Sequence, residues 1–478
     1  MVGREKEIRL LKNACESGKA ELIAVYGRRR IGKTYLVHKT FNDSFSFSHA
    51  GLSPIELSKQ SPREILASQL TAFRNSLIYY GYDCPMISNW LDAFLQLELF
   101  LKPRLEEHKP IIIFLDELPW MDTTSSKFLS AFEWFWNGWA CRYEQIKLIV
   151  CGSSVSYMSN RLIQSKAGFY GRVTLEIPML PFTLKETESF FLSKDIRYSR
   201  YDIVRAYMAF GGIPYYLDYF KKGDTIAKNI DALLFGANPV LRKEFNSLFP
   251  AIFDNPHEVE SIVRELAKKN IGLTRKEICD CTKISDGGTL STMLNALEHS
   301  SMIYRYASFG GNKKEVRYKL LDPFCIFYLR FVEGARSLDP AFWQGKSLSQ
   351  SVISWRGVAF ENICFNHIQE IKEALGIRGI STNVFPYIVN GDGDSAQIDI
   401  IIERADNFVN LCEAKFYGDD FTQTKKENDA LRKKTNAIVP LIPKKASIHP
   451  ILITTFGLTY NEYSGDYEQV VTLDDLFA

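Results

Sequence analysis

The stretch that decides the fold runs from Leu22 to Thr34 and reads LIAVYGRRRIGKT. Its first part, Leu22–Tyr26, is a continuous apolar run, which predicts a strand buried on both faces. The second part, Gly27–Thr34, matches G-x-x-x-x-G-K-[ST], and a helical pattern follows from Tyr35. This strand, loop and helix setting is what a phosphate-binding loop needs. The stretch therefore predicts an α/β domain built on a doubly wound parallel sheet.

The residue types in this loop suit the binding of nucleotide phosphates. Glycines let backbone N–H groups close around the phosphates, Lys33 brings a positive charge to the β- and γ-phosphates, and the Thr34 hydroxyl can ligate magnesium. The alternative is a glycine turn in front of an ordinary helix, but the bare pattern arises by chance in only about one or two per cent of such chains. The expected nucleotide contacts in this stretch are Gly27, Arg28, Arg29, Arg30, Ile31, Gly32, Lys33, Thr34 and Tyr35.

A second strand ends in two carboxylates. Ile111–Leu115 is another continuous apolar run, and Asp116 and Glu117 follow it directly. In a doubly wound sheet such a strand end lies beside the phosphate loop, so we expect Asp116 to hold the magnesium shell and Glu117 to polarise the attacking water. A solvated acidic turn is the alternative, and the presence of the first motif makes it the weaker one.

Two further residues extend this expected site. The apolar strand Lys147–Cys151 ends near Ser153, whose hydroxyl would either sense the γ-phosphate or cap the following helix. Arg172 precedes the β-like run Val173–Ile177 and would act as an arginine finger, in cis or toward a neighbouring subunit. A surface salt bridge is the alternative role for Arg172.

Composition describes an ordinary folded protein of several domains. The chain of 478 residues is too long to fold around one hydrophobic core, and its length suggests roughly three or four units. No apolar run is long enough to span a membrane, and the start of the chain is charged where a signal peptide would be apolar. Nine scattered cysteines predict reduced thiols, so we expect a cytoplasmic protein. A net charge of +2 neither indicates nor excludes nucleic acid binding.

The middle of the chain changes to helices and then to a mixed module. Leu184–Phe253 is helical in pattern with Gly and Pro breaks, which predicts a small helical lid over the nucleotide. Three helix-length segments and two strands around a turn follow, and this order predicts a winged helix. These segments are Val259–Lys269, Arg275–Thr282, Thr289–Ser300, Met302–Phe309 and Glu315–Leu321.

A winged helix often binds DNA through its third helix. Here the third helix, Thr289–His299, contains neither Arg nor Lys. The basic residues lie instead in the wing and its strand, where they would either meet phosphates or form a solvated surface. DNA contact and an interdomain or protein-binding role therefore both stay open. The basic residues are Arg305, Lys313, Lys314, Arg317 and Lys319.

The ordered motifs of residues 1 to 250 resemble the archaeal-type ATPases of the STAND group, which are relatives of the AAA+ ATPases. The resemblance implies that Arg4 lies near the adenine and that Pro214, in the lid, packs beside the base. Without the resemblance, Gly211–Gly212 would be a helix-ending turn and Pro214 a helix start. The motifs are Val2–Glu5, the phosphate loop, Leu115–Glu117, Gly171–Arg172, Leu180–Phe182 and Gly211–Pro214.

The C-terminal part carries carboxylates and a lysine on two predicted strands, Gln397–Ile402 and Asn410–Lys415. If the strands are adjacent, Asp399 comes close to Glu413, and Glu413 and Lys415 project from the same face. Two carboxylates form a hard-oxygen site for magnesium, and a lysine can orient or deprotonate the water that attacks a phosphodiester. A same-face salt bridge between Glu413 and Lys415 is the alternative.

These residues resemble the PD-(D/E)XK nucleases, with Gln397-Ile398-Asp399 in place of the usual Pro-Asp. The resemblance adds Glu361, on a helix expected to run from Trp355 to about Ala374, and implies a Mg²⁺ or Mn²⁺ ion held by Glu361, Asp399 and Glu413. A later helix with Gln423, Lys425 and Lys426 is expected to face the same site.

Together these patterns predict four regions: residues 1–180 as a P-loop ATPase core, 181–255 as a helical lid, 256–322 as a winged helix, and 323–478 as a linker and restriction-endonuclease-like α/β domain. The expected function is an ATP- and Mg²⁺-dependent ATPase coupled to a nuclease-like effector that acts on double-stranded DNA. One alternative is a regulatory signalling NTPase that binds protein or nucleic acid without cleavage. Another is a remodelling ring, which predicts ATP-dependent homo-oligomers.

Overall fold

The strand before the phosphate loop is β1 (Glu21–Tyr26), and it lies within a five-stranded parallel sheet. The strand order is β2-β3-β4-β1-β5, so β4 lies between β1 and the strand that ends in Asp116. The α/β architecture with a parallel sheet is therefore confirmed. The other strands are β2 (Phe47–Ala50), β3 (Ile111–Asp116), β4 (Ile146–Gly152) and β5 (Leu175–Pro178).

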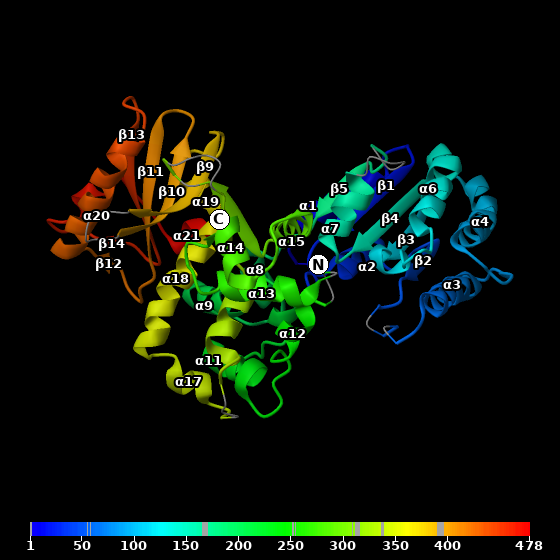
Figure 1. Cartoon of the computed structure of the whole chain (residues 1–478), viewed down its shortest axis with the longest axis horizontal. Helices are drawn as coiled ribbons and strands as arrows, with labels where there is room; N and C mark the ends of the chain where they lie inside the picture. Colours follow the sequence, from blue (N-terminus) through cyan, green and yellow to red (C-terminus); the bar gives the residue numbers. More distant parts are fainter. Residues whose placement is uncertain are drawn as a thin grey trace. The chain divides into compact units, whose positions relative to one another are not determined.

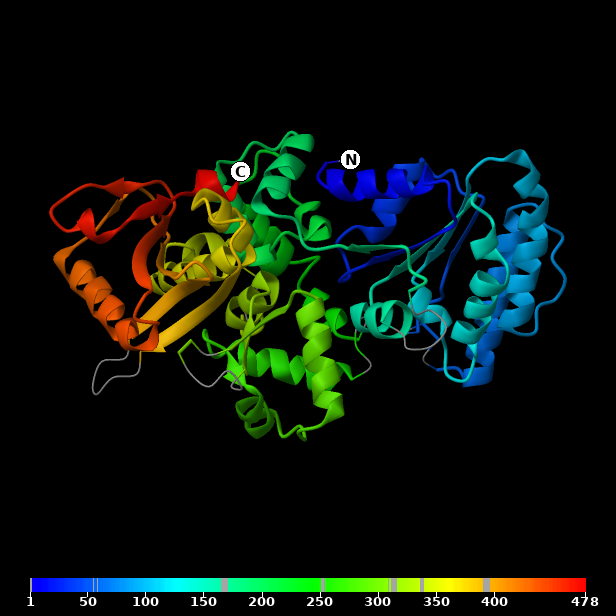
Figure 2. The same ribbon diagram turned by 90° about the horizontal axis from the view of Figure 1, so that it is seen from above.

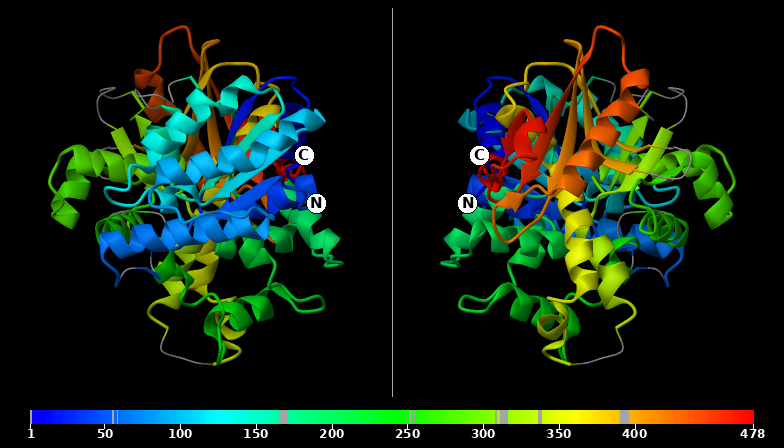
Figure 3. Two further views of the ribbon diagram at one scale, coloured as in Figure 1. Left: turned by 90° about the vertical axis from the view of Figure 1, so that its right-hand side faces the viewer. Right: turned by 90° about the vertical axis from the view of Figure 1, so that its left-hand side faces the viewer.

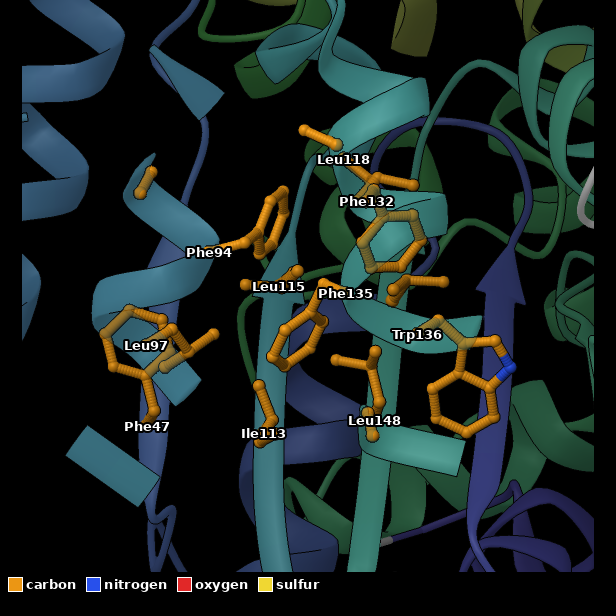
Figure 4. Close-up of a cluster of buried hydrophobic side chains, with 14 of the residues drawn as sticks. Phe47, Phe94, Leu97, Ile113, Leu115, Leu118, Phe132, Phe135, Trp136 and Leu148 are labelled. Atoms are coloured by element: carbon orange, nitrogen blue, oxygen red, sulfur yellow. The ribbon is translucent and has the colours of Figure 1, made fainter. Parts of the chain in front are cut away.

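Helices cover both faces of this sheet, as its apolar strands require. On one face, alternate strand residues meet a large aromatic core from α3 (Pro62–Tyr79), α4 (Trp90–Leu101) and α6 (Phe128–Gly138). Figure 4 shows this core, and the left-hand view of Figure 3 looks onto its helices. On the other face the ring of His38, from α2 (Lys33–Phe41), lies 5.5 Å from that of Phe114.

Short elements complete this part of the chain. α1 (Glu5–Cys15) contacts α2, and α5 (Leu118–Met121) follows the acidic strand end. The remaining short segments are η1 (Lys102–Glu107), η2 (Ala140–Arg142), α7 (Val155–Tyr157) and η3 (Met158–Ile163).

The computed structural model describes residues 2–54, 56–57, 59–164, 171–250, 253, 255–307, 309–310, 316–335, 339–389 and 396–478. Lys313 and Lys314 lie outside these residues. The chain divides into two compact units, a first unit of Met1–Leu180 with Ser247–Pro256 and a second unit of Pro181–Asn246 with His257–Ala478. The predicted winged helix and nuclease-like domain, apart from Pro256, and the predicted lid up to Asn246 thus fall in the second unit, while the end of the predicted lid falls in the first. The four-part division stays a prediction. None of the helices in the described ranges is long and apolar enough to cross a membrane.

The second unit begins with the helices of the predicted lid. α9 ends where Gly211 takes a positive φ of 62°, and Pro214 opens the next helix, as the residue types alone predict. α12 crosses the boundary between the two units. The helices are α8 (Leu184–Ser193), α9 (Arg200–Phe210), α10 (Pro214–Leu217), α11 (Ile226–Ile230), η4 (Asp231–Phe235) and α12 (Glu244–Leu248).

Three helices and a small sheet of order β6-β8-β7 come next. They agree closely in extent with the predicted segments, and a short strand, β6, joins the two expected ones. The elements are α13 (Pro256–Leu266), α14 (Arg275–Thr282), α15 (Gly288–His299), β6 (Leu273–Thr274), β7 (Ile303–Ala307) and β8 (Val316–Leu320).

The rest of the second unit is a mixed sheet with order β15-β13-β11-β10-β9 and its helices. β9, β10 and β11 are antiparallel, whereas β11, β13 and β15 are parallel. α20 (Lys425–Ile438) lies along one side of the sheet (Figures 1 and 2), and the right-hand view of Figure 3 looks onto these elements. The strands are β9 (Thr382–Val389), β10 (Ala396–Arg404), β11 (Phe408–Lys415), β13 (Ser447–Thr454) and β15 (Gln469–Val471).

One helix expectation needs correction. The segment from Trp355 to Ala374 is not continuous, because α18 (Gln350–Asn366) and α19 (Ile368–Ala374) are separated at His367. His367 leaves helical geometry, and its Nδ1–H donates to the Ile363 carbonyl. The other elements are α16 (Pro323–Phe327), η5 (Tyr328–Val332), α17 (Phe342–Lys346), β12 (Phe421–Thr422), η6 (Val439–Leu441), β14 (Leu458–Thr459), η7 (Ser464–Asp466) and α21 (Leu473–Leu476).

Candidate nucleotide site and C-terminal carboxylate site

The phosphate loop has the backbone that its glycines allow. Gly27 has a φ of 153° and Gly32 a φ of 85°, both in the region that side chains rarely adopt. A Cβ at Gly27 would also lie 2.3 Å from the carbonyl oxygen of Met179. Glycine is therefore required at this position both by conformation and by space.

Lys33 lies at the start of α2 with its side chain buried. Its Nζ donates to the Ser153 hydroxyl at 2.9 Å and to the Arg28 carbonyl at 3.1 Å. A buried ammonium needs such acceptors, because leaving it unpaired would be strongly unfavourable. These contacts hold the charge at the loop, where phosphate oxygens can take the place of the two acceptors.

Thr34 and Asp116 bring two oxygen donors together. The Thr34 hydroxyl donates to Asp116 Oδ2 at 2.8 Å, and Asp116 Oδ1 accepts the Glu117 N–H at 3.0 Å. A hydroxyl next to a carboxylate suits Mg²⁺, so these residues fit the ion that the phosphate loop implies. Bound there with ATP, Mg²⁺ would neutralise charge on the phosphate oxygens.

Glu117 and Ser153 join the acidic strand end to Lys33. Glu117 has a positive φ of 47°, and its carboxylate accepts both the N–H and the hydroxyl of Ser153. The Ser153 hydroxyl therefore bridges Glu117 and Lys33, while the N-cap residue of α7 is Ser154. Ser153 is thus not the N-cap residue of α7, and its role in sensing the γ-phosphate stays a prediction.

The remaining predicted residues of this site fall in different places. Arg4 is buried in the first unit, and its guanidinium donates to the Leu180 carbonyl at 2.6 Å. Arg28 and Ile31 are buried, Arg29 and Arg30 are half-buried, and Tyr35 is exposed. Arg172 is exposed in a turn before β5, whereas Pro214 belongs to the second unit. The roles of Arg4, Arg172 and Pro214 stay predictions.

Three features define a P-loop ATPase domain. A buried strand leads into a glycine loop, Lys33 and Thr34 lie at the start of the following helix, and Asp116 lies beside Thr34. Residues 1–220 match a family described as the ATPase domain predominantly from Archaea. ATP binding follows from this match and from the loop geometry.

Proteins similar to this chain include three from archaea. The chain is 26% identical over 377 residues to the uncharacterized protein MJECL04 of Methanocaldococcus jannaschii, covering 78% of each. Among solved structures, the Walker-type ATPase PABY2304 of Pyrococcus abyssi is 19% identical with a TM-score of 0.46, over 69% of this chain and 96% of that one. Cdc6p of Pyrobaculum aerophilum is 16% identical with a TM-score of 0.31, over 68% and 93%.

The second cluster of candidate residues lies on the C-terminal sheet. β10 and β11 are adjacent as expected, and the Ala414 N–H donates to Asp399 Oδ2 at 2.9 Å. Lys415 Nζ lies 3.6 Å from Glu413 Oε2, while Glu361 on α18 accepts from the Gln397 amide at 3.1 Å. The structure thus brings Asp399, Glu413 and Lys415 together.

Two lysines that the sequence did not assign to this site also approach these carboxylates. Lys434 of α20 donates to Glu413 Oε1 at 2.5 Å. Lys319 of β8 is buried and interacts electrostatically with Glu361 and Asp399. A signal existed for Lys434, because it lies three residues after the buried Leu431 and four before the buried Ile438, on the apolar face of the helix. The later helix does not include Gln423, because α20 begins at Lys425 with Thr424 as its N-cap. Gln423 is buried, whereas Lys425 and Lys426 are exposed.

The pKa values of these groups reflect burial and crowding. Burial, followed by repulsion from Glu413 and Glu361, raises the pKa of Asp399 well above its ordinary value. Burial also raises the pKa of Glu361, and it lowers the pKa of Lys319 to about 8. For Lys415, burial lowers the pKa, but the combined attraction of the surrounding acidic groups, led by Glu413 and Asp399, outweighs it and raises the pKa. Lys415 is therefore suited to orient groups by charge rather than to accept a proton.

The predicted metal triad does not form a metal site as the side chains stand. Within the described part of the chain, no group of three or more His, Cys, Asp or Glu side chains is placed to hold an ion. Lys434 and Lys415 instead contact Glu413. Asp399, Glu413 and Glu361 thus supply suitable oxygen donors, but in an arrangement that lysines neutralise.

Proposed function

We propose that this protein is an ATP-driven switch whose nucleotide-dependent lid acts on a C-terminal nuclease-like domain directed at DNA. One observation carries the coupling. The ring of Tyr201 on α9 stacks on that of Phe416, with centroids 4.9 Å apart and an interplanar angle of 5°. The Phe416 ring in turn packs against the Phe360 ring, with centroids 5.4 Å apart. Phe416 directly follows Lys415, and Phe360 directly precedes Glu361.

Further contacts join the lid helices to the same domain. The Leu184 N–H, at the start of α8, donates to His367 Nε2 at 2.9 Å, and Arg200 pairs with Asp474 at 2.6 Å. Both ends of the His367 ring are thus bonded, which requires the neutral imidazole with its proton on Nδ1; burial lowers the His367 pKa to about 4. A displacement of α8 or α9 on ATP binding would move α18 and β11 with it.

The contacts of the predicted winged helix favour an interdomain role over DNA binding. The Tyr304 hydroxyl of β7 donates to the Val384 carbonyl of β9 at 3.0 Å, and Phe309 packs on Phe385 with ring centroids 5.7 Å apart. Of the basic residues expected to meet phosphates, Lys319 is buried and Arg317 pairs with Glu277, while Arg305 is exposed. We propose that this module is a winged helix that supports the C-terminal sheet.

DNA cleavage is tested on supercoiled plasmid with Mg²⁺ or Mn²⁺ and ATP. If Lys415 orients the reacting groups, Lys415→Ala should slow nicking by about 10²-fold or more, as for the loss of a positioned catalytic group. Lys433→Ala, at an exposed lysine of α20, is the matched control and should nick like wild type. A Lys33→Ala variant shows whether ATP controls the cut. If neither metal yields cleavage that depends on Lys415, the nuclease part of the proposal fails.

Coupling is tested independently of cleavage. In wild type, a non-hydrolysable ATP analogue should change hydrogen–deuterium exchange in β11, and Tyr201→Ala should abolish that change. Aromatic pairs are worth about 0.5–1.5 kcal/mol, so exchange in β11 of this variant should also rise by about two- to tenfold. Tyr201→Phe keeps the stacked ring and should behave as wild type. A nucleotide response that persists unchanged in Tyr201→Ala would rule out this route.

A regulatory NTPase that binds without cutting is the second candidate, and the pairing of Glu413 with Lys434 and Lys415 favours it. Such a regulatory NTPase would keep its function in a Lys415→Ala variant.

All nine cysteines are free thiols, which supports a cytoplasmic setting for either candidate. A role for Arg172 toward a neighbouring subunit requires ATP-dependent oligomers, and sedimentation with and without ATP tests it.

A further inference from the structure

The carboxylate of Glu413 is held by two lysines from different elements. Lys434 of α20 donates to Oε1 at 2.5 Å, and Lys415 of β11 lies 3.6 Å from Oε2. The side chains of Glu413 and Lys434 are only 5% and 13% exposed. This pair is thus largely removed from water, unlike the exposed ion pairs that add little to stability.

The position of Lys434 is unusual for a lysine. α20 turns Asn428, Leu431 and Ile438 toward the protein interior, and Lys434 lies between Leu431 and Ile438 on that face. Leu431 and Ile438 pack with Val409 and Leu411 of β11, which alternate onto the same face as Glu413. A lysine in this row is tolerated because a buried carboxylate lies opposite it.

A further polar atom near Lys415 lacks a hydrogen-bond partner. Thr454 lies beside Lys415 in the parallel register of β11 and β13, so the two side chains share a face of the sheet. Thr454 Oγ1 is buried and has no hydrogen-bond partner among the described residues. Buried polar atoms are rarely left unsatisfied, so a water or another bound group is needed beside Lys415.

We infer that Lys434 occupies the cation position of the C-terminal site, so that a divalent metal binds Glu361, Asp399 and Glu413 only after Lys434 leaves Glu413. This inference rests on the nuclease-like part of the proposed function. An ammonium group bonded to Glu413 uses a lone pair that a metal would need, and it repels a second cation at the same carboxylate. Lys434 is therefore an inhibitory residue, and its ion pair keeps the site from loading metal.

Calorimetric titration of the full chain with Mn²⁺, without nucleotide, tests this directly. Lys434→Met keeps the aliphatic length and removes the charge, and it should bind Mn²⁺ at least about tenfold more tightly than wild type, as expected when a charge this close is removed. Lys434→Arg should bind as weakly as wild type. Lys433→Met, at an exposed lysine of the same helix, is the matched control and should also match wild type.

The gained affinity must belong to this site and not to the phosphate loop. Adding Glu413→Gln to Lys434→Met should therefore abolish it. An Mn²⁺ affinity in Lys434→Met equal to that of wild type, or a gain that survives Glu413→Gln, would overturn the inference. Thermal unfolding verifies that each variant is folded, and Lys434→Gln, for which the same gain is expected, replaces Lys434→Met if the latter does not fold.

Failure of this inference and failure of the proposed nuclease give different results. Tighter Mn²⁺ binding by Lys434→Met without any plasmid cleavage supports the role of Lys434 and counts against nuclease activity. Cleavage that depends on Lys415, with unchanged Mn²⁺ affinity in Lys434→Met, supports the nuclease and overturns the role of Lys434.

Discussion

Lys33→Ala is expected to reduce the rate of ATP hydrolysis by about 10²–10³-fold, as for other preorganised groups that stabilise charge in a transition state. Lys33 is the buried ammonium of the phosphate loop, and its Nζ is already held by Ser153 and the Arg28 carbonyl. Alanine would leave the charge on the transferred phosphoryl group without this partner. The steady-state release of phosphate with saturating ATP and Mg²⁺ measures the effect.

Two controls define what Lys33 contributes. Lys39→Ala, at an exposed lysine of the same helix, should hydrolyse ATP within about twofold of wild type. Glu117→Gln should bind ATP but hydrolyse it slowly, because it keeps Lys33 and Thr34 while removing the carboxylate expected to polarise water. Hydrolysis by Lys33→Ala at the wild-type rate would show that another site turns over the nucleotide.

Gly212→Ala is expected to destabilise the second unit by about 3 kcal/mol, because the added methyl group has no room. Its Cβ would lie 1.9 Å from the Phe182 carbonyl oxygen, which is backbone and cannot move aside as a side chain would. The two residues are also tied by a hydrogen bond of 2.6 Å from the Phe182 N–H to the Gly212 carbonyl. Urea unfolding, monitored by proteolysis at sites in each unit, measures the change in the free energy of unfolding.

Gly357→Ala is the matched control for this substitution. Gly357 lies inside α18, and a Cβ there would meet nothing within 4 Å. Alanine is a better helix former than glycine, so this variant should gain up to about 1 kcal/mol. Equal stability of Gly212→Ala and wild type would mean that the turn after α9 can shift away from Phe182.

The consequence of Gly212→Ala extends to the proposed coupling. The Phe182 carbonyl also accepts a hydrogen bond from the Tyr207 hydroxyl at 2.8 Å, and the Tyr207 ring contacts His367 with centroids 5.4 Å apart. The turn expected beside the nucleotide base is thereby connected to the end of α18, the helix that carries Glu361. The strained turn of Gly212→Ala should therefore disturb this connection as well as lower the free energy of unfolding.

Much of the fold and the nucleotide site could be predicted from local sequence. A buried strand, a glycine loop and a helix start are consecutive in the chain, so Gly27, Lys33 and Thr34 carry their own structural context. The strand β3 and the carboxylates at its end were equally predictable from the sequence, because a parallel strand buried on both faces is a continuous apolar run. The alternation of β11 likewise predicted that Glu413 and Lys415 share a face.

Contacts between distant segments could not be predicted in this way. Period-two alternation places Lys319 on the opposite face of β8 from Tyr318 and Leu320, which is ordinarily a solvent-facing position, yet the chain buries all three. His367 similarly reads as one more residue of a helix until its bond with Leu184 is known. Burial of these side chains depends on which surfaces meet, and no local pattern contains that information.

The nucleotide chemistry was thus encoded in two local motifs, because the backbone of one loop and the ends of two strands suffice to place the loop and the expected magnesium ligands. The state of the C-terminal site depended on tertiary structure alone. Glu413 and Lys434 are 21 residues apart, and the packing of α20 on the sheet brings them into contact. A carboxylate buried by that packing needs a cation, and the fold decides that a lysine supplies it.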